Sequence, residues 1–523
     1  MKKIIERILI LLRYLFAIGI IVIIGYNAKS MKTLILDYSS RRGYFLPVTW
    51  IWILSVILII FIIYCGYVCG LHNTKYFFPF IIFFISLIPR LYVFSKQLYI
   101  PTNDFKNYYD YGINLYYGNF DVIATTIERY QMPKMGGIAI FNYVLLKLFS
   151  PTLIGLQFGN VIITSMICVE IYFIIKDESK WAAVIAAILY AIYPSSIVTT
   201  QVTTNHHGAT FLFLLSIIAY KGAIKRADWK GYLYVAIASI LLVCSNFVHP
   251  SAIIILIAIV IVTLFSMILR KDERSTKKEE TVFKRIKKCL KTPKTIYILF
   301  IVFSFIVLSD LGVESLYNKG IIRNKKEISI AFKVVLGLNE TSRGRYNAED
   351  TSMILRAPYE EQTKLCISII RDRITNPKSL ALLMAEKTIY MWGGVDGYFN
   401  WYRQGYNLKY EELENEDKLK YQTGNTMVND VVSGVLWFDT LFLMVVYLFV
   451  SISLISTKVW KGGDVSYIMM LIALGWVCLI FFTEVQSRYR YPAMPSLMII
   501  AGFSIEKMLR GIKRVQQSSF IQF

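Results

Sequence analysis

Long apolar stretches dominate the hydrophobic pattern of this chain. Runs of about 17–25 residues, the length needed to cross the hydrocarbon core of a bilayer as a helix, recur along the sequence. They predict twelve membrane spans, near residues 8–27, 46–69, 77–97, 152–175, 181–199, 206–224, 231–248, 250–269, 295–311, 433–455, 465–483 and 491–509. The pattern therefore predicts an all-α polytopic membrane protein.

Two segments interrupt this pattern. Residues 136–150 are apolar, but a run of about 14 residues is too short to cross upright, and Lys147 near its end favours an interfacial helix. Residues 312–432 have mixed polarity and frequent aromatic residues, with helical patterning at 348–373 and 377–391. We interpret residues 312–432 as an extracytoplasmic loop domain lying over one membrane face.

The spans and loops divide the chain into four parts. We expect an N-terminal pair of helices at 1–76, a helical core at 77–311 with its first extracytoplasmic loop at 98–150, the loop domain at 312–432, and C-terminal helices with a basic cytoplasmic tail at 433–523.

Basic residues orient the predicted bundle. The formal net charge is +22, and between Arg270 and Lys294 eleven Lys and Arg residues stand against four acidic ones. Such an excess in a short loop between two apolar runs is typical of a cytoplasmic loop and does not indicate nucleic-acid binding. Three more basic loops fall on the same predicted side, at 176–180, 221–230 and 458–461, whereas Lys29, Lys32, Arg41 and Arg42 fall on the other. Twelve crossings then place both termini in the cytoplasm.

The first polar stretch with candidate chemistry follows the third predicted span. It reads Pro101-Thr-Asn-Asp-Phe-Lys-Asn-Tyr-Tyr-Asp-Tyr-Gly112. Asp104 lies at the water-facing end of the span, where a carboxylate stays ionised and can meet a reactant held in the bilayer. It suits a general base for an acceptor hydroxyl, or else it is a helix N-cap. Asp110 and Asp121 are alternative bases in the same loop.

The second polar stretch joins the last two predicted spans. It reads Glu484-Val-Gln-Ser-Arg-Tyr-Arg-Tyr-Pro-Ala-Met-Pro495. Arg488 and Arg490 suit a phosphate because a guanidinium donates two hydrogen bonds at once. In an extended segment both would point the same way; if the last helix already begins here, only one reaches a phosphate, and Arg488 is preferred. The alternative is an aromatic and cationic belt at the interface.

The order of these features resembles the GT-C glycosyltransferases, membrane enzymes that take sugars from polyprenyl-phosphate donors. The resemblance covers about residues 77–310 and 465–509. It rests on Asp104 just after a span, on Met132-Pro-Lys-Met-Gly-Gly137 before a short apolar helix, and on the arginine-tyrosine-proline stretch near the last helices. Many relatives carry two prolines where this chain has only Pro133 before Lys134.

The resemblance implies a GT-C-like bundle of about 12 transmembrane helices and an activity similar to that of protein O-mannosyltransferases and lipid A aminoarabinose transferases. It implies transfer from a polyprenyl-phosphate-linked sugar to a glycan, lipid or protein of the cell envelope on the extracytoplasmic face. Asp104 would be the catalytic base. Side chains near the same predicted face would bind the donor phosphate or sugar, namely Arg488, Arg490, Tyr489, Lys134, Arg129 and His249.

The remaining polar candidates have less specific roles. His206, His207 and Glu128 are candidates for contacting the acceptor or a divalent metal, and polar capping of helix ends explains the histidines equally well. Arg90, near the end of a span, either faces a cavity or snorkels to the interface.

Two other functions stay open at this point. They are transport or flipping of lipid-linked saccharides, and a non-catalytic place in an envelope polysaccharide complex. A transporter should carry charged or broken-helix sites near mid-membrane and internal repeats. The sequence pattern indicates neither, which favours the transferase.

Overall fold

The computed structural model describes residues 11–28, 76–95, 99–269, 292–393, 438–456 and 463–520. Throughout these ranges the regular elements are α-helices and short 3-10 helices, with no strand. The predicted all-α class is therefore confirmed. The predicted span at 46–69 and most of the basic loop at 270–294 lie outside the described residues.

Eight helices in these ranges are long and apolar enough to cross a membrane, and each coincides with a predicted span. They are the helix Leu11–Ala28, α3 (Phe77–Ser95), α7 (Leu153–Ile175), α10 (Asn205–Ile224), α11 (Trp229–Val248), α14 (Pro293–Asn318), the helix Phe438–Ile455 and α21 (Asp464–Phe482).

The other predicted spans within the described ranges take different forms. The span at 181–199 is broken into α8 (Lys180–Ala191) and α9 (Pro194–Val198), with a bend of 58° at the break. Pro194 explains the break, because proline lacks the backbone donor that continues a helix. The span at 250–269 is the shorter apolar helix α12 (Ala252–Leu269). The count of about twelve spans is not confirmed.

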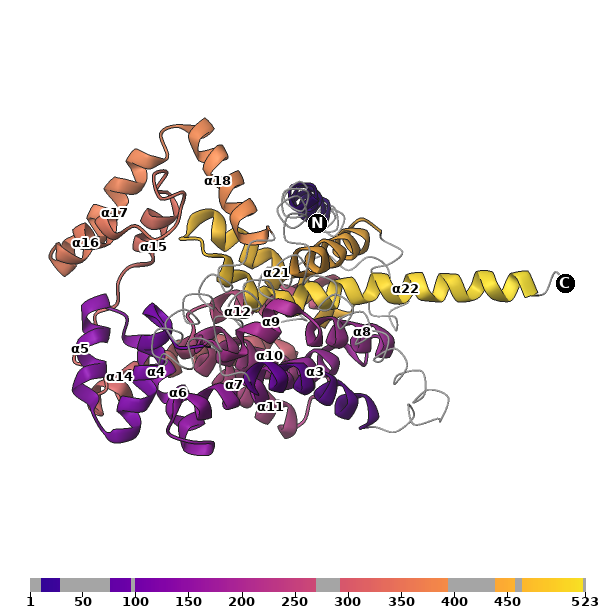
Figure 1. Cartoon of the computed structure of the whole chain (residues 1–523), viewed down its shortest axis with the longest axis horizontal. Helices are drawn as coiled ribbons and strands as arrows, with labels where there is room; N and C mark the ends of the chain where they lie inside the picture. The colour runs from indigo at the N-terminus through magenta and orange to yellow at the C-terminus, as the bar shows by residue number, and fades with distance from the viewer. Residues whose placement is uncertain are drawn as a thin grey trace, which may run out of the picture.

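The last predicted span begins irregularly. A 3-10 helix, η4 (Ser487–Ala493), precedes the long C-terminal helix α22 (Met494–Phe520), which projects from the bundle in Figure 1. Pro492 interrupts regular α-helical hydrogen bonding in this stretch.

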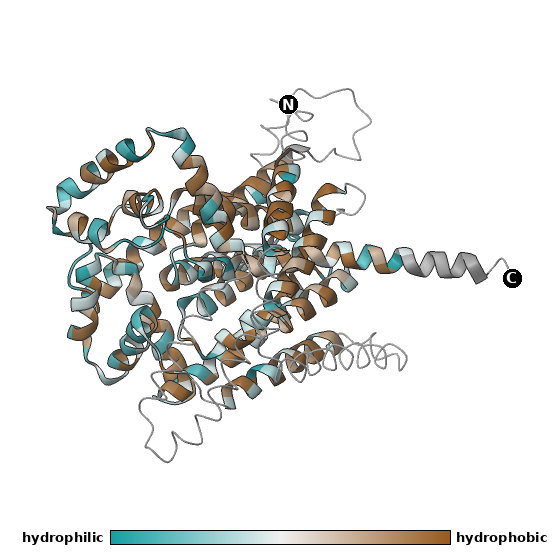
Figure 2. Ribbon diagram, turned by 45° about the horizontal axis from the view of Figure 1, so that its top comes forward, coloured by the Kyte–Doolittle hydropathy of each residue, from teal (hydrophilic) through white to brown (hydrophobic). Residues whose placement is uncertain are grey.

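The bundle is organised around α7 and α10. These helices pack against each other, α10 packs along α11, and α7 packs along α3 and α8. By contrast, α3 and α14 keep large apolar side chains at the surface, among them Phe80, Ile88, Leu299 and Phe303. Figure 2 shows apolar residues running along the helices of the bundle. Apolar surface of this extent fits contact with lipid tails.

The first loop folds into helices at one end of the bundle. They are α4 (Asn103–Tyr117), α5 (Phe120–Tyr130), the 3-10 turn η2 (Pro133–Met135) and α6 (Gly136–Leu148). At 13 residues α6 is too short to cross upright, as its sequence predicts. It packs closely on α4, where a Cβ on Gly112 would lie 2.6 Å from Cβ of Asn142. The Asn142 amide also donates to the carbonyl of Tyr108 at 2.8 Å.

The segment predicted as a loop domain contains four further helices beside the bundle (Figure 1). They are α15 (Ile330–Gly337), α16 (Ala348–Arg356), α17 (Tyr359–Arg373) and α18 (Pro377–Trp392). We call residues 330–393 the loop domain. The predicted helical patterning at 348–373 and 377–391 matches α16 to α18, with Pro358 separating α16 from α17.

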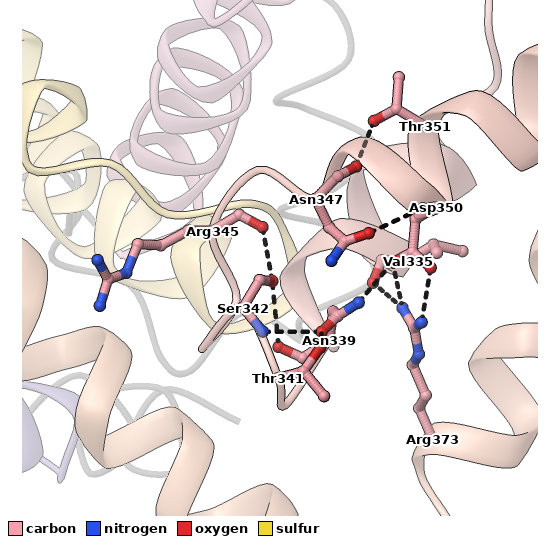
Figure 3. A network of polar contacts seen from close by, with 9 residues as sticks. All are labelled: Val335, Asn339, Thr341, Ser342, Arg345, Asn347, Asp350, Thr351 and Arg373. Carbon is pink, nitrogen blue, oxygen red and sulfur yellow. Dashed lines mark hydrogen bonds and ion pairs between the residues drawn. The ribbon is translucent and has the colours of Figure 1, made fainter.

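A polar network ties α15, α16 and α17 together (Figure 3). Arg373 donates two hydrogen bonds of 2.9 Å to the carboxylate of Asp350 and one of 2.6 Å to the carbonyl of Val335. The Asn339 amide donates to the same carboxylate at 2.8 Å. Burial alone would raise the pKa of Asp350, but the hydrogen bonds from Arg373 and Asn339 hold this pKa below its ordinary value.

Candidate functional site

The ends of several helices bring the two polar stretches together. Asp104 lies in the first turn of α4, and Arg488 lies in the second position of η4. Although 384 residues separate them, Nη2 of Arg488 donates to Oδ2 of Asp104 at 2.7 Å. The N-cap of α4 is Thr102, so Asp104 is not the N-cap itself. Its position in the first turn still suits the positive end of the helix dipole.

The two partners differ in exposure. The side chain of Asp104 is 51% exposed, whereas that of Arg488 is only 7% exposed. The guanidinium carbon of Arg488 lies 5.1 Å from the ring centre of Phe105 and 5.7 Å from that of Tyr489. Burial would lower the pKa of Arg488, but Tyr489, Tyr108 and Asp104 raise this pKa above its ordinary value. Arg488 is thus a permanent cation held beneath a solvent-exposed carboxylate.

Two histidines lie next to this pair. The rings of His206, at the start of α10, and His249, just after α11, have centres 4.5 Å apart. The ring of Tyr489 lies 5.9 Å from His206 and 6.4 Å from His249. Burial, together with repulsion from Arg488, lowers the pKa of His249 to about 3. His249 is therefore neutral near pH 7 and meets any ligand as a hydrogen-bonding group rather than as a cation.

Arg490 occupies a different place from Arg488. It donates to the carbonyls of Gly393 at 2.6 Å and Met391 at 3.3 Å, and its Nη2 lies 3.4 Å from Oδ2 of Asp439. The side chains of this ion pair are 1% and 0% exposed. The structure thus follows the alternative in which the segment is already helical and the two arginines do not converge.

His207 also lies inside the bundle. Its Nδ1 is 3.0 Å from the hydroxyl of Tyr491, and its Nε2 is 2.9 Å from the carbonyl of Thr199. Both ring nitrogens thus have partners within the protein. His207 contacts different groups from His206, although the two are adjacent in sequence.

The candidates on α5 and η2 form exposed contacts with the segment that follows α14. Lys134 pairs with Glu327 at 2.7 Å, and Glu128 accepts a hydrogen bond from Asn324 at 2.9 Å. Arg129 is exposed at the end of α5. None of these contacts brings the three side chains to Asp104, so their roles stay predictions.

The candidate metal ligands do not gather. Within the described part of the chain, no group of three or more His, Cys, Asp or Glu side chains is arranged to hold a metal ion. His206 and His207 face different partners, and Glu128 contacts Asn324.

Arg90 joins α3 to the broken span. Its guanidinium donates to Oγ of Ser86 at 2.7 Å, to Oγ of Ser196 at 2.6 Å and to the carbonyl of Ala191 at 3.1 Å. Because the side chain is fully buried among protein groups, it does not snorkel. Its partners at the break suggest that it stabilises the bend between α8 and α9.

Sequence reasoning missed two buried charged residues near the site. Asp439 accepts hydrogen bonds from the backbone N–H and the hydroxyl of Ser195, at 3.0 and 2.8 Å, besides pairing with Arg490. Lys387 is fully buried in α18. An acidic residue next to an apolar run could have pointed to Asp439, whereas the sequence around Lys387 carries no comparable signal.

Comparison with known proteins gives a matching family and several similar solved structures. A family model described as conserved hypothetical integral membrane protein matches residues 154–509. No curated protein matches the chain.

Two of the similar solved structures are oligosaccharyltransferases from Archaeoglobus fulgidus. AglB in complex with an inhibitory peptide and a dolichol-phosphate shows 13% identity and a TM-score of 0.42, covering 85% of this chain and 52% of that one. The enzyme tethered to an acceptor peptide shows 12% identity and a TM-score of 0.41, covering 84% and 50%. The chain thus spans about half the length of each.

Proposed function

The chain belongs to the family of conserved hypothetical integral membrane proteins, and we propose that it is a glycosyltransferase using polyprenyl-phosphate-linked sugars. The observation that carries the proposal is the ion pair between Asp104 and Arg488. It sets a carboxylate that can accept a proton beside a buried cation that can hold a phosphate. The multi-pass bundle, with eight candidate spans among the described residues, supports a substrate that resides in the bilayer.

The proposed reaction is a single inverting displacement. The acceptor hydroxyl attacks the anomeric carbon of the sugar, its proton passes to the carboxylate of Asp104, and the bond between the anomeric carbon and the phosphate oxygen breaks. The polyprenyl phosphate leaves with the electron pair of that bond. Arg488 stabilises the negative charge that grows on this leaving group, and its burial strengthens the interaction.

The ion pair also predicts an order of binding. In the structure Nη2 of the Arg488 guanidinium already donates a hydrogen bond to the carboxylate of Asp104. A donor phosphate that binds Arg488 would compete with this carboxylate and release Asp104. The released carboxylate is then free to accept the proton of the acceptor hydroxyl. We therefore expect the donor to bind before the acceptor reacts.

The broken span favours a second candidate, a carrier of lipid-linked saccharides. The bend of 58° between α8 and α9 with Arg90 beside it is the type of feature found in transporters, and the sequence pattern did not indicate it. However, Arg90 donates to groups of the protein itself at this break. The Asp104–Arg488 pair has no evident use in a carrier, so the transferase remains the preferred function.

The proposal is tested by supplying purified protein in nanodiscs with a labelled polyprenyl-phosphate sugar and an envelope acceptor fraction, and measuring released polyprenyl phosphate. Asp104→Asn should slow release by about 10²–10⁴-fold, the range typical of losing acid–base help. Asp110→Asn should be nearly active, because Asp110 lies six residues further along α4, which is about 1.7 helical turns and turns it to a different face. Equal rates for wild type and Asp104→Asn would contradict the proposal. Movement of intact donor across vesicles without release would favour the carrier.

A further inference from the structure

The segment that carries Arg488 is held by the loop domain. Between the end of α21 and the start of η4, two backbone amides donate to loop-domain carbonyls. The N–H of Glu484 donates to the carbonyl of Lys333 at 3.0 Å, and the N–H of Val485 donates to that of Gly344 at 2.8 Å. The side chains of Lys333 and Glu484 also pair at 2.8 Å. These contacts fix the backbone three to four residues before Arg488.

Lys387 strengthens this attachment from the interior. Its Nζ donates to the carbonyls of Gly337 at 2.8 Å, Thr483 at 2.9 Å and Phe481 at 3.2 Å. The last carbonyls of a helix lack partners within the helix and carry partial negative charge. Lys387 in α18 therefore acts as a cap for the end of α21, supplied by a different part of the chain.

The packing at this junction is close on both sides. A Cβ on Gly337 would lie 2.4 Å from the carbonyl carbon of Thr483. A Cβ on Gly344, whose φ is +70°, would lie 2.6 Å from Cδ of Lys387. Because real Cβ atoms do not approach other atoms so closely, only glycine permits the loop domain to sit this near the segment.

The loop domain also holds the segment on the far side of Arg488. The carbonyls of Met391 and Gly393, at the end of α18, accept hydrogen bonds from Arg490. Arg488 thus lies between two attachment points, Glu484–Val485 on one side and Arg490 on the other. Both are made by the same domain.

We propose that the loop domain is a positioning element for Arg488, and that Lys387 is the positioning residue at its centre. This inference rests on the proposed role of Arg488 in binding the donor phosphate. Lys387 does not touch Asp104 or Arg488 through any hydrogen bond described above; it fixes the backbone that places Arg488 against Asp104. Without it, the guanidinium shifts relative to the carboxylate and the bound phosphate.

The central variant is Lys387→Met, which keeps the aliphatic length and removes the ammonium. Its matched control is Lys378→Met, an exposed lysine on the same helix. In nanodiscs, hydrogen exchange at the amides of Glu484 and Val485 should become faster in Lys387→Met and stay unchanged in Lys378→Met. Donor turnover should fall by up to about 10²-fold, the loss that a misplacement of about 1 Å can cause. Lys387→Arg, which keeps a cationic donor, should retain part of the donor turnover that Lys387→Met loses.

A double-variant comparison separates positioning from general damage. In an Arg488→Ala background, Lys387→Met should cause little further loss, because coupled residues are not additive. Losses that multiply would overturn the inference, as would unchanged exchange at Glu484 and Val485. If Lys387→Met does not fold, Lys333→Met removes the ion pair to Glu484, leaves the Lys387 hydrogen bonds in place and provides the same comparison.

The exchange measurement does not depend on the proposed chemistry. If the wild type releases no phosphate from any donor, the proposed function fails. Binding of polyprenyl phosphate alone, compared between wild type and Lys387→Met, then decides the inference together with the exchange rates: weaker binding and faster exchange support it, and equal values overturn it.

Discussion

Arg488 and Arg490 offer a direct test, because only one residue separates them and yet their substitution should affect different properties of the protein, namely turnover and stability. Arg488 pairs with a half-exposed carboxylate, and Arg490 pairs with a fully buried one. We expect Arg488→Ala to impair turnover with a moderate loss of stability. We expect Arg490→Ala to impair folding.

The magnitudes follow from the burial of each partner. An ion pair with a solvated partner contributes about 0.2–1 kcal/mol, and a contact between a desolvated cation and an aromatic ring contributes about 2 kcal/mol. Removing Arg488 should therefore cost about 2–3 kcal/mol of folding free energy, and no more than that, because Asp104 stays hydrated. Losing one group that stabilises charge in the transition state typically slows a reaction by about 10²–10³-fold, or about 2.7–4 kcal/mol.

Removing Arg490 should affect the stability of the fold more than the reaction. Asp439 would stay buried without its cation, and breaking a buried pair in this way costs about 3–5 kcal/mol. The carbonyls of Met391 and Gly393 would lose their donor as well. Arg490→Ala should therefore lower the unfolding temperature more than Arg488→Ala does.

The assay combines thermal unfolding in nanodiscs with release of polyprenyl phosphate per folded molecule. Arg488→Lys should recover part of the turnover, because lysine keeps the charge but not the two-pronged donor. The reasoning is refuted if Arg488→Ala unfolds as readily as Arg490→Ala while its folded fraction turns over donor at the wild-type rate. Arg488 would then be structural, and the phosphate would be held elsewhere.

Three further predictions concern the loop domain and its orientation. Ionised Asp350 stabilises the folded state at pH values above its unfolded pKa of about 3.9, and this stabilisation is lost as the pH falls through its lower folded pKa. Hydrogen exchange in α16 should therefore become faster in acid, and Asp350→Asn should abolish this pH dependence. Gly337→Ala should destabilise the junction by about 1–3 kcal/mol, measured by thermal unfolding, because its Cβ meets the backbone of Thr483. In a cysteine-free background, a cysteine at exposed Ser352 should react with an impermeant reagent in intact cells, whereas one at Ser275, outside the described residues, should not; equal labelling would contradict the orientation.

The apolar pattern predicts most of the bundle because the length of a span is set by the thickness of the bilayer, and each segment satisfies this requirement independently of the rest of the chain. It misses the break at Pro194, since the residues around this proline are apolar enough to read as one continuous span. It also predicts α16 to α18, because their helical periodicity is local.

The site depends on contacts that no local pattern contains. Asp104 and Arg488 meet across 384 residues, and only the resemblance to GT-C enzymes placed both in one site. Whether Arg488 and Arg490 converge depends on the 3-10 geometry of η4, which alternation in the sequence does not specify. Lys387 reads as an ordinary helix lysine until the fold surrounds it with carbonyls.

The buried pair of Asp439 and Arg490 has a consequence for biogenesis. Asp439 begins a span that is synthesised before α21, whereas Arg490 emerges 51 residues later, just ahead of the last helix. Ser195, the other partner of Asp439, is made long before either. A nascent chain that stops short of residue 490 therefore lacks Arg490, the cation that pairs with Asp439 in the folded bundle, and burying this carboxylate without that cation is unfavourable. We therefore expect the segments that precede residue 490 to pack stably in the membrane only after η4 has been made and supplies this cation.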